Sequence, residues 1–320
     1  MITLFGLSEK LLKEKSVALI CHVRPDGDTI GSACALKLAL NSKGIKAQVF
    51  CTDAVPQKFA FLSETKNVLT AYSGSLSDFS AIVAIDNAEI TRLGDFAAEF
   101  SAHKNTYSID HHISNTRYAN VNYVAEKASN AENVFALIKE MNAEITPEIA
   151  NLLATGIMTD TGGFRHKNVT AGTFADAGEL VRMGADMNSI YYNAFVKQRK
   201  NRAELFGKTM SRIRYFHGGR CAIASVLSGD FKSTGAMPEE TEGFIDFVMS
   251  IDGVEIGACV METECNKFKV SLRSKDADVN AVAGIFGGGG HKLASGCKIC
   301  GEYEEVIDKL TVAIGKYLDD

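Results

Sequence analysis

The sequence lacks an excess of positive charge. Its 320 residues include 34 Lys and Arg against 39 Asp and Glu, which gives a formal net charge of −5. Proteins that coat long duplex nucleic acid carry a basic surplus that neutralises phosphates. We therefore expect no long duplex DNA as a partner, whereas a short anionic ligand in a local pocket is compatible with this charge.

The sequence also lacks the marks of a membrane or secreted protein. No apolar run is long enough to span a bilayer. The N-terminal segment MITLFGLSEKLLKEK has no apolar signal core followed by small residues at a cleavage site. We expect a cytoplasmic protein with no membrane partner.

Paired cysteines are scarce as well. Among eight cysteines, only Cys297 and Cys300 form a C-x-x-C pair, and a structural zinc site usually needs four ligands. Most of the others lie in apolar segments, where cysteine acts as a small core residue. Reduced structural thiols are therefore favoured over a zinc or redox site.

The first half of the chain contains alternating strand-like and helix-like segments. Apolar runs predict strands over 17–21, 45–52, 81–85 and 105–109, and a helix rich in small residues is expected over 30–42. This alternation predicts an α/β domain with a largely parallel sheet. Three of the strands lead into acidic or histidine-containing loops, which is where open α/β sheets bind their ligands.

A second, smaller α/β domain is expected in the C-terminal part. One long connecting helix is predicted over 189–216, because this segment has no proline and only one glycine. Strand and helix patterns resume beyond it, with strands expected over 220–227, 254–263 and 267–274 and helices over 240–251 and 303–317. The predicted parts are residues 1–187, a helical connector at 188–216, and residues 217–320.

The first polar cluster places His22, Asp26 and Asp28 within seven residues on a tight loop. Imidazole and carboxylate groups ligate divalent cations, and a carboxylate can bridge two of them. The alternative is an exposed acidic turn in which an Asp only caps the next helix.

Two more clusters follow predicted strands directly. Asp86 comes after five apolar residues, a position at which Asp is often only a helix cap. Asp110 precedes His111 and His112, which cannot both point the same way from an extended backbone. One histidine can bind metal while Asp110 orients an imidazole through its second nitrogen. Two satisfied surface histidines are the alternative.

The fourth cluster joins Asp160, Thr161 and Arg165 around a glycine pair. A carboxylate, a hydroxyl and a guanidinium lie close together there, and the alternative is a helix C-cap at Gly162 or Gly163.

The fifth cluster is a run of four glycines before His291. Backbone N–H groups of the glycines can together bind an anion, and the guanidinium of Arg273, upstream, can bind a phosphate through two N–H groups. A flexible loop is the alternative. Among weaker features, Tyr191, Tyr192 and Phe195 are interpreted as core residues rather than a base-stacking platform.

Taken in order, these motifs resemble the DHH phosphoesterase superfamily. The resemblance rests on H-x-x-x-D-x-D-x-x-G-S, the strand-end Asp, D-H-H and D-T-G-G-F-R. The late G-G-G-G-H with an upstream R-S is similar to the DHHA1 substrate-binding domain. The two-domain length is most similar to the nanoRNase/pAp-phosphatase branch. The resemblance implies a catalytic domain at 1–187, a substrate-binding domain at 217–320 and an active-site cleft between them.

The resemblance also implies a site with two metal ions. His22, Asp26 and Asp86 would hold one ion, and Asp28, Asp86, His111 and Asp160 the other, with Asp86 bridging. The catalytic residues implied are Asp86, Asp110 and His112. His112 would lie near the scissile phosphate, and Asp110 would contact the metal ligands without binding a metal itself. The implied substrate-binding residues are Arg273, Ser274, Gly287, Gly288, Gly289, Gly290 and His291, joined by Ser114, Asn115 and Arg165, which could instead brace the site.

Mixed imidazole and carboxylate ligands favour Mn²⁺ over Mg²⁺, with Co²⁺ also compatible. The function implied is metal-dependent hydrolysis of RNA fragments of a few nucleotides and of 3′-phosphoadenosine 5′-phosphate (pAp), with a homodimer allowed. Alternatives are a phosphodiesterase for cyclic di-AMP or its linear product pApA, a class II-type pyrophosphatase, and a nucleotide-binding protein without catalysis.

Overall fold

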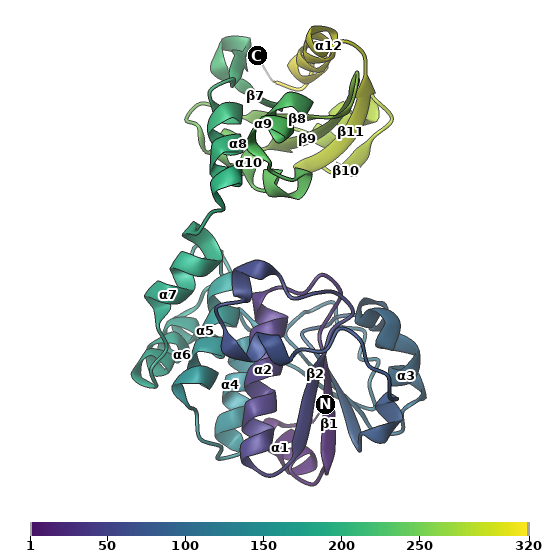
Figure 1. The fold of residues 1–320 in the computed structure, drawn as a ribbon, viewed down its shortest axis with the longest axis vertical. Coiled ribbons are helices and arrows are strands. Elements are labelled where there is room, and N and C mark those ends of the chain that lie inside the picture. Colours follow the sequence, from purple (N-terminus) through teal and green to yellow (C-terminus); the bar gives the residue numbers. More distant parts are fainter. Residues whose placement is uncertain (1, 319–320) are drawn as a thin grey trace. The chain divides into compact units, whose positions relative to one another are not determined.

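The structure of the chain, a computed structural model, describes residues 2–318. It divides into two compact units, Met1–Lys197 and Gln198–Asp320, each with its own sheet and hydrophobic core (Figure 1). None of the helices in the described part of the chain combines the length and apolar character needed to cross a bilayer.

The first unit is built on a five-stranded sheet whose paired strands all run parallel, in the order β2-β1-β3-β4-β5. The central strands are buried on both faces, as their uninterrupted apolar sequences require. Because the strands are parallel, their carboxyl ends meet at one edge of the sheet. The strands are β1 (Ser16–Ile20), β2 (Lys46–Phe50), β3 (Ala81–Ile85), β4 (Thr106–Asp110) and β5 (Val121–Val124).

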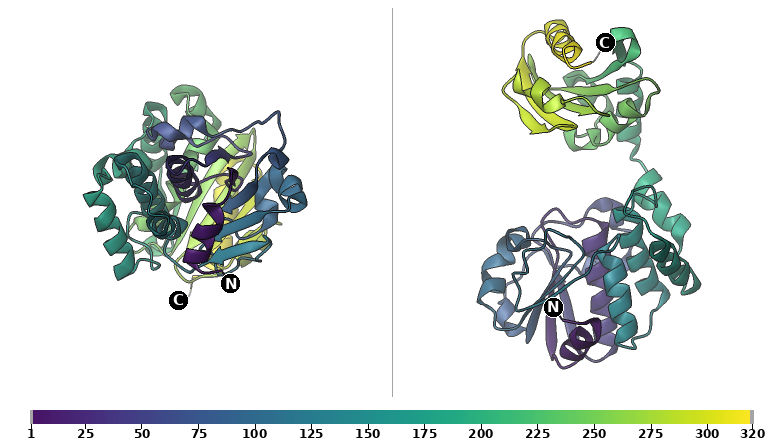
Figure 2. Two further views of the ribbon diagram at one scale, coloured as in Figure 1. Left: turned by 90° about the horizontal axis from the view of Figure 1, so that it is seen from below. Right: turned by 180° about the vertical axis from the view of Figure 1, so that it is seen from behind.

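Helices cover both faces of this sheet, with α2, α4 and α5 on one side and α3 on the other (Figures 1 and 2). This arrangement confirms the predicted α/β domain with a parallel sheet. The helices are α1 (Leu4–Leu11), α2 (Gly27–Ser42), α3 (Ala97–Ala102), α4 (Asn130–Glu140), α5 (Pro147–Asp160), α6 (Ala171–Arg182) and α7 (Met187–Tyr191).

Helices α2 and α5 pack unusually close together, and glycine makes this possible. A Cβ atom at Gly31 would lie 2.3 Å from the Leu152 carbonyl oxygen, and one at Gly156 would lie 2.7 Å from Asp28 Oδ1. No real Cβ occupies such positions, so any larger residue would force the two helices apart. The contact fixes the N-terminus of α2 beside the C-terminus of α5.

The second unit contains a six-stranded mixed sheet in the order β10-β11-β9-β8-β7-β6. Only β7 and β8 pair in parallel, and the other neighbours are antiparallel. The strands are β6 (Arg214–Phe216), β7 (Cys221–Val226), β8 (Ile256–Glu264), β9 (Lys267–Ser274), β10 (Gly289–His291) and β11 (Ala294–Cys300).

The helices of the second unit are divided between the two faces of its sheet. Helices α11 and α12 contribute apolar residues to the main core on one face. Helices α8, α9 and α10 pack on the other face, mainly against β7 and β8. The helices are α8 (Lys200–Met210), α9 (Ser228–Thr234), α10 (Phe244–Ser250), α11 (Val279–Gly284) and α12 (Tyr303–Gly315).

The single helix predicted over 189–216 is wrong. After α7 the chain forms a π-helical turn at Tyr192–Val196, becomes extended at Lys197 and Arg199, and re-enters α-helix only at Lys200. The physical reason lies in packing: Ile190 is buried in the core of the first unit and Leu205 in a core of the second. The polar residues between them have no core to pack on, and intrinsic helix propensity alone does not stabilise a helix there.

Candidate active site

The polar residues predicted from the sequence gather at the carboxyl edge of the first sheet. His22 lies just beyond β1, Asp86 directly follows β3, and Asp110 is the last residue of β4. These three strands are adjacent, so the loops that follow them meet. His22, Asp86 and Asp110 are almost fully buried, which is rare for such groups unless they have partners.

Two helix ends complete this group of residues. Asp26 is the N-cap of α2, and its Oδ1 accepts hydrogen bonds from the N–H groups of Asp28 and Thr29 at 3.0 and 3.1 Å. Its other oxygen, Oδ2, lies 3.6 Å from His22 Nε2. Asp26 therefore caps the helix and also faces the site. Asp160, the last residue of α5, enters from the opposite helix end.

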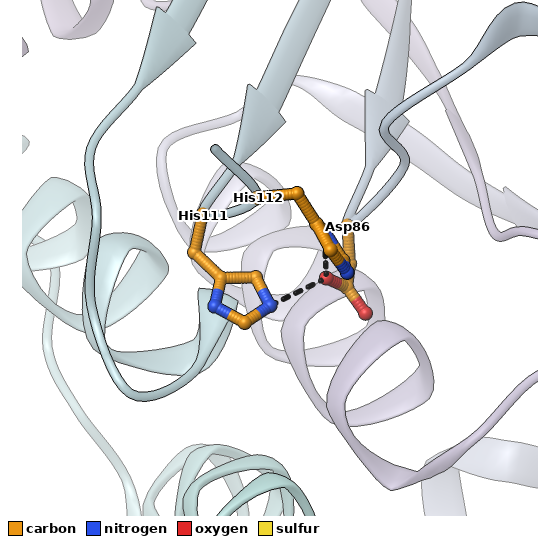
Figure 3. Close-up of side chains that lie close together, drawn as sticks. All are labelled: Asp86, His111 and His112. Carbon is orange, nitrogen blue, oxygen red and sulfur yellow. Dashed lines mark ion pairs between the residues drawn. The ribbon is translucent and has the colours of Figure 1, made fainter. Parts of the chain in front are cut away.

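Asp86 lies at the centre of the group. Its Oδ1 is 3.4 Å from His111 Nε2 and 3.6 Å from His112 Nδ1 (Figure 3). Its Oδ2 is 3.7 Å from His22 Nε2. Oδ1 is buried without a hydrogen-bond partner, and the backbone has a φ of 57°, which is unfavourable for a residue other than glycine. Strain and an unsatisfied buried oxygen in one residue are typical of a functional site.

The donor atoms fall into overlapping groups of the size that a metal ion requires. Those of His22, Asp26 and Asp86 lie within 4.8 Å of one another, as do those of Asp28, His111 and Asp160, and a third group of Asp86, His111 and His112 shares a residue with each. The structure thus brings together all six residues for which a metal-binding role is implied. The donor set, together with the unsatisfied Asp86 oxygen, fits a divalent cation.

The histidine rings are oriented by hydrogen bonds on the side away from the carboxylates. His22 Nδ1 lies 2.8 Å from the Val23 carbonyl and His111 Nδ1 lies 3.0 Å from the Lys127 carbonyl. When Nδ1 donates to the carbonyl and Nε2 is deprotonated, Nε2 faces the carboxylates as a ligand atom for a cation, as in metal-binding histidines. His112 differs, because its Nδ1 lies 2.8 Å from Asp110 Oδ1.

Asp110 is completely buried and fully occupied. Its Oδ1 also accepts the His111 N–H at 2.9 Å, and its Oδ2 accepts the Asn115 side-chain amide at 2.6 Å. Asp110 therefore orients His112 and is not free to bind a metal. Asn115 is turned inward to hold this carboxylate, whereas Ser114 is exposed on the same loop.

The segment after Asp160 forms a tight turn as well as contributing to the site. Gly162 and Gly163 have φ values of 57° and 69°, which is the helix C-cap conformation. Arg165 is exposed and its Nε donates to the Gly162 carbonyl at 2.8 Å. The glycine turn therefore caps α5, and the Asp160 carboxylate still faces the site, so the two interpretations of this cluster are compatible.

In the second unit, the run of glycines is not a free loop. Gly289 and Gly290 belong to β10, which pairs with β11. The N–H groups of Gly287, Gly288 and Gly290 donate to Gly284, to Ala283 and to the Asn280 side chain at 3.0, 2.9 and 2.8 Å. A Cβ at Gly288 would lie 2.2 Å from the Gly296 carbonyl oxygen. Close packing therefore explains much of the glycine content.

The polar residues near the glycine run, Arg273, Ser274 and His291, lie in different surroundings. Arg273 and His291 both lie opposite Ala294, in one row across β9, β11 and β10. Ser274 donates its hydroxyl to the Ala277 carbonyl at 2.5 Å and so braces a turn.

Comparison with known proteins identifies the two units. The profile of the "DHH family, N-terminal domain" matches residues 16–157, and that of the "DHHA1 domain" matches residues 218–320. The chain is a phosphoesterase of the DHH family.

Relatives of this DHH phosphoesterase extend over nearly its whole length. A protein of Thermus thermophilus named "Bifunctional oligoribonuclease and PAP phosphatase NrnA" is 29% identical, with 92% of this chain and 89% of the relative covered. A protein of the same name from Bacillus subtilis is 26% identical, with 89% of each covered. The crystal structure of an exopolyphosphatase-related protein from Bacteroides fragilis has a TM-score of 0.82 and 27% identity, covering 98% of this chain and 96% of that one.

The electrostatics of this DHH phosphoesterase reflect the crowding of charge. Burial, followed by the charges of Asp86 and Asp160, raises the pKa of Asp28 well above its usual value. Burial and Asp86 raise the pKa of Asp160 to about 6. Burial opposes protonation of His22 and His111, but hydrogen-bonded carboxylates outweigh it and raise the pKa of each to about 10.

Asp86 shows the opposite behaviour. Burial would raise its pKa, but the close contacts with His111 and His22 outweigh that effect and lower it. Without a metal, these pKa shifts favour the protonated forms of His22 and His111. A divalent cation would displace these protons, because metal ligands bind in their deprotonated forms.

One supporting element was missed by sequence reasoning. The backbone N–H groups of Asn130 and Ala131, at the start of α4, donate to the two Asp28 oxygens at 2.6 and 2.8 Å. The signal was present as a capping box, since Ser129 and Glu132 have the S-x-x-E spacing. It marks where a helix begins, but not which carboxylate will lie against that helix.

The prediction that Tyr191 and Tyr192 are core residues is wrong. Their side chains are 47% and 52% exposed, whereas Phe195 packs partly against the core. Tyr191 ends α7 and Tyr192 begins the π-helical turn, so both follow Ile190, the buried residue of this helix.

Proposed function

We propose that this DHH phosphoesterase hydrolyses RNA fragments of a few nucleotides to mononucleotides and removes the 3′-phosphate of pAp to leave AMP. The observation that carries the proposal is the placement of Asp86. Its two carboxylate oxygens face different histidines and join two groups of metal-ligand type. The names of relatives that match over most of the chain support the substrates.

His22, Asp26 and Asp86 would hold one cation, and Asp28, His111 and Asp160 the other. Asp86 would join the second set through its contact with His111. We favour Mn²⁺, because imidazole donors suit it better than Mg²⁺, with Co²⁺ as a substitute. When bound, such cations would supply activation of a water molecule and neutralisation of phosphate charge.

His112 is the residue best placed to assist the departing oxygen. Its Nδ1 donates to Asp110, so the ring is fixed and Nε2 is presented on the other side. The hydrogen bond and charge of Asp110 raise the pKa of His112. A protonated His112 would donate a hydrogen bond to the phosphoryl group or a proton to the leaving oxygen.

Arg273 and His291 would bind a phosphate of the substrate within the second unit. They lie in one row of the sheet, separated by the small residue Ala294. An arginine fork and an imidazole suit a phosphate better than the glycine N–H groups, three of which already have partners.

The test is a substrate panel. The full chain is incubated with pApA, a five-nucleotide RNA and pAp, each with Mn²⁺ or with EDTA. We expect hydrolysis of all three that depends on metal. Activity that survives EDTA, or no activity on any of the three, would contradict the proposal.

The same panel separates two other functions. A kcat/KM for cyclic di-AMP that exceeds those of the linear substrates would indicate a cyclic dinucleotide phosphodiesterase. Tight binding of pAp without turnover would indicate a nucleotide-binding protein.

A further inference from the structure

The second unit has a sheet face that its helices leave partly uncovered. Side chains alternate along β9 and β11, and one set packs into the core with α11 and α12. The other set points to the opposite face, where α8, α9 and α10 pack mainly on β7 and β8. We call the β9–β11–β10 part of that second face the open face. It presents Lys269, Ser271 and Arg273 from β9, Ala294, Gly296 and Lys298 from β11, and Gly289 and His291 from β10.

The register of the sheet arranges these residues in rows. Arg273 pairs with Ala294, which pairs with His291, so the arginine and the histidine flank a small residue. Two residues further along β9 the row consists of Ser271, Gly296 and Gly289, and it has almost no side chains. A shallow floor of small residues therefore adjoins the cationic row.

The next row contains two lysines directly opposite each other. Lys269 pairs with Lys298, and both are exposed. Like charges at paired positions of an antiparallel sheet are destabilising. Glu264, the nearby acid, makes its ion pair with Lys267 at 2.7 Å and interacts with Lys298 only through its charge. An anion bound between Lys269 and Lys298 would convert this repulsion into attraction.

The two cationic rows are four residues apart along β9. At the rise of a β-strand this is about 13 Å, which an extended RNA strand covers in about two nucleotide steps. The small residues of the middle row leave room for a sugar and a base above them.

We propose that the open face is a phosphodiester track for single-stranded RNA. Arg273 and His291 hold one phosphate, and Lys269 and Lys298 hold a phosphate about two nucleotides away. This inference rests on the proposed function, in which Arg273 and His291 bind substrate. It adds that affinity depends on chain length: a dinucleotide is too short to reach both rows, whereas a pentanucleotide reaches them.

The test compares binding of two lengths. Calorimetry measures the Kd of a phosphorothioate pentanucleotide and a phosphorothioate dinucleotide for the full chain with Mn²⁺. In Lys269→Gln/Lys298→Gln the Kd of the pentanucleotide should rise about tenfold and that of the dinucleotide less than about threefold. The slope of log Kd against log salt for the pentanucleotide should fall by about 0.7, since the contact with one phosphate is lost.

A matched control removes the same charge elsewhere. Lys232→Gln/Lys316→Gln alters two exposed lysines, on α9 and at the C-cap of α12, outside the open face. The control should leave both Kd values within about twofold of the unaltered chain.

Several outcomes would overturn the track. These are an unaltered chain that binds the pentanucleotide no more tightly than the dinucleotide, a variant that weakens both lengths equally or neither, and a control that matches the variant. Length-dependent binding without hydrolysis of either natural substrate would refute the proposed function and leave the track standing.

Discussion

The metal-ligand group of the first unit and the open face of the second unit handle charge in opposite ways. In the first, carboxylates and imidazoles are buried, and nearly every oxygen and nitrogen has a fixed neighbour. In the second, lysines are exposed, and two of them face each other across paired strands. The first arrangement suits chemistry, which needs preorganised groups. The second suits a polyanion, whose binding tolerates imprecise geometry.

The largest effect is expected when the charge of Asp86, at the centre of the buried metal-ligand group, is removed. Asp86→Asn keeps the shape of the side chain but removes the charge with which Asp86 would hold cations, so kcat on pApA should fall by at least about a thousandfold. Circular dichroism and melting temperature should stay close to those of the unaltered chain. Asp95→Asn, at an exposed acid of the same unit, is the control and should retain full activity. A variant at Asp86 with more than a tenth of the original rate would show that this carboxylate is dispensable.

The next test moves a carboxylate without changing it. In Gly156→Ala the new methyl group would crowd Asp28 Oδ1, 2.7 Å away, and the Ala131 methyl group, 2.6 Å away. We expect a loss of about 2 kcal/mol in the free energy of unfolding and about a hundredfold in kcat. Gly178→Ala in α6 is the matched control, because its Cβ meets nothing within 4 Å. It should be neutral or slightly stabilising, and equal losses in the two variants would refute the positioning argument.

A third test concerns the pH at which His112 works. Asp110 raises the pKa of His112, so Asp110→Asn should lower it. Protonated His112 would then be lost at a lower pH, and the basic limb of the kcat profile should move toward acid. We also expect kcat at its optimum to fall about thirtyfold, as for other groups that orient active-site imidazoles. A drop in kcat with an unmoved pH profile would indicate that His112 does not act as an acid.

The smallest effect is expected on the open face. Lys298→Thr should raise the free energy of unfolding by about 0.5 kcal/mol, because it relieves the repulsion with Lys269. Lys269→Thr should do the same, and the double variant should gain little more, since either change removes the shared repulsion. Urea titrations would measure this. Additive gains would mean that the two charges do not interact.

The sequence allowed much of the first unit to be predicted, because local patterns dominate there. The apolar run 81–85 is the observed β3, and the following Asp86 lies at the sheet edge where α/β folds bind ligands. Parallel pairing then brings His22, Asp86 and Asp110 together without further information.

What could not be predicted depends on distant partners. The support of Asp28 by Asn130 and Ala131 joins residues about a hundred positions apart, and no local pattern encodes it. Likewise, the glycines at 287–290 resemble a loop until their pairing with β11 is known. The break at Lys197 reflects two separate cores competing for one helical segment, which propensity alone does not reveal.

The two edge strands of the second sheet have a consequence for solubility. Both β6 and β10 are only three residues long. A short edge offers few free N–H and C=O groups to another chain, so it is a poor template for intermolecular pairing. Long edge strands beside a partly uncovered sheet face would favour edge-to-edge association. The shortness of β6 and β10 limits such pairing while part of the face stays uncovered.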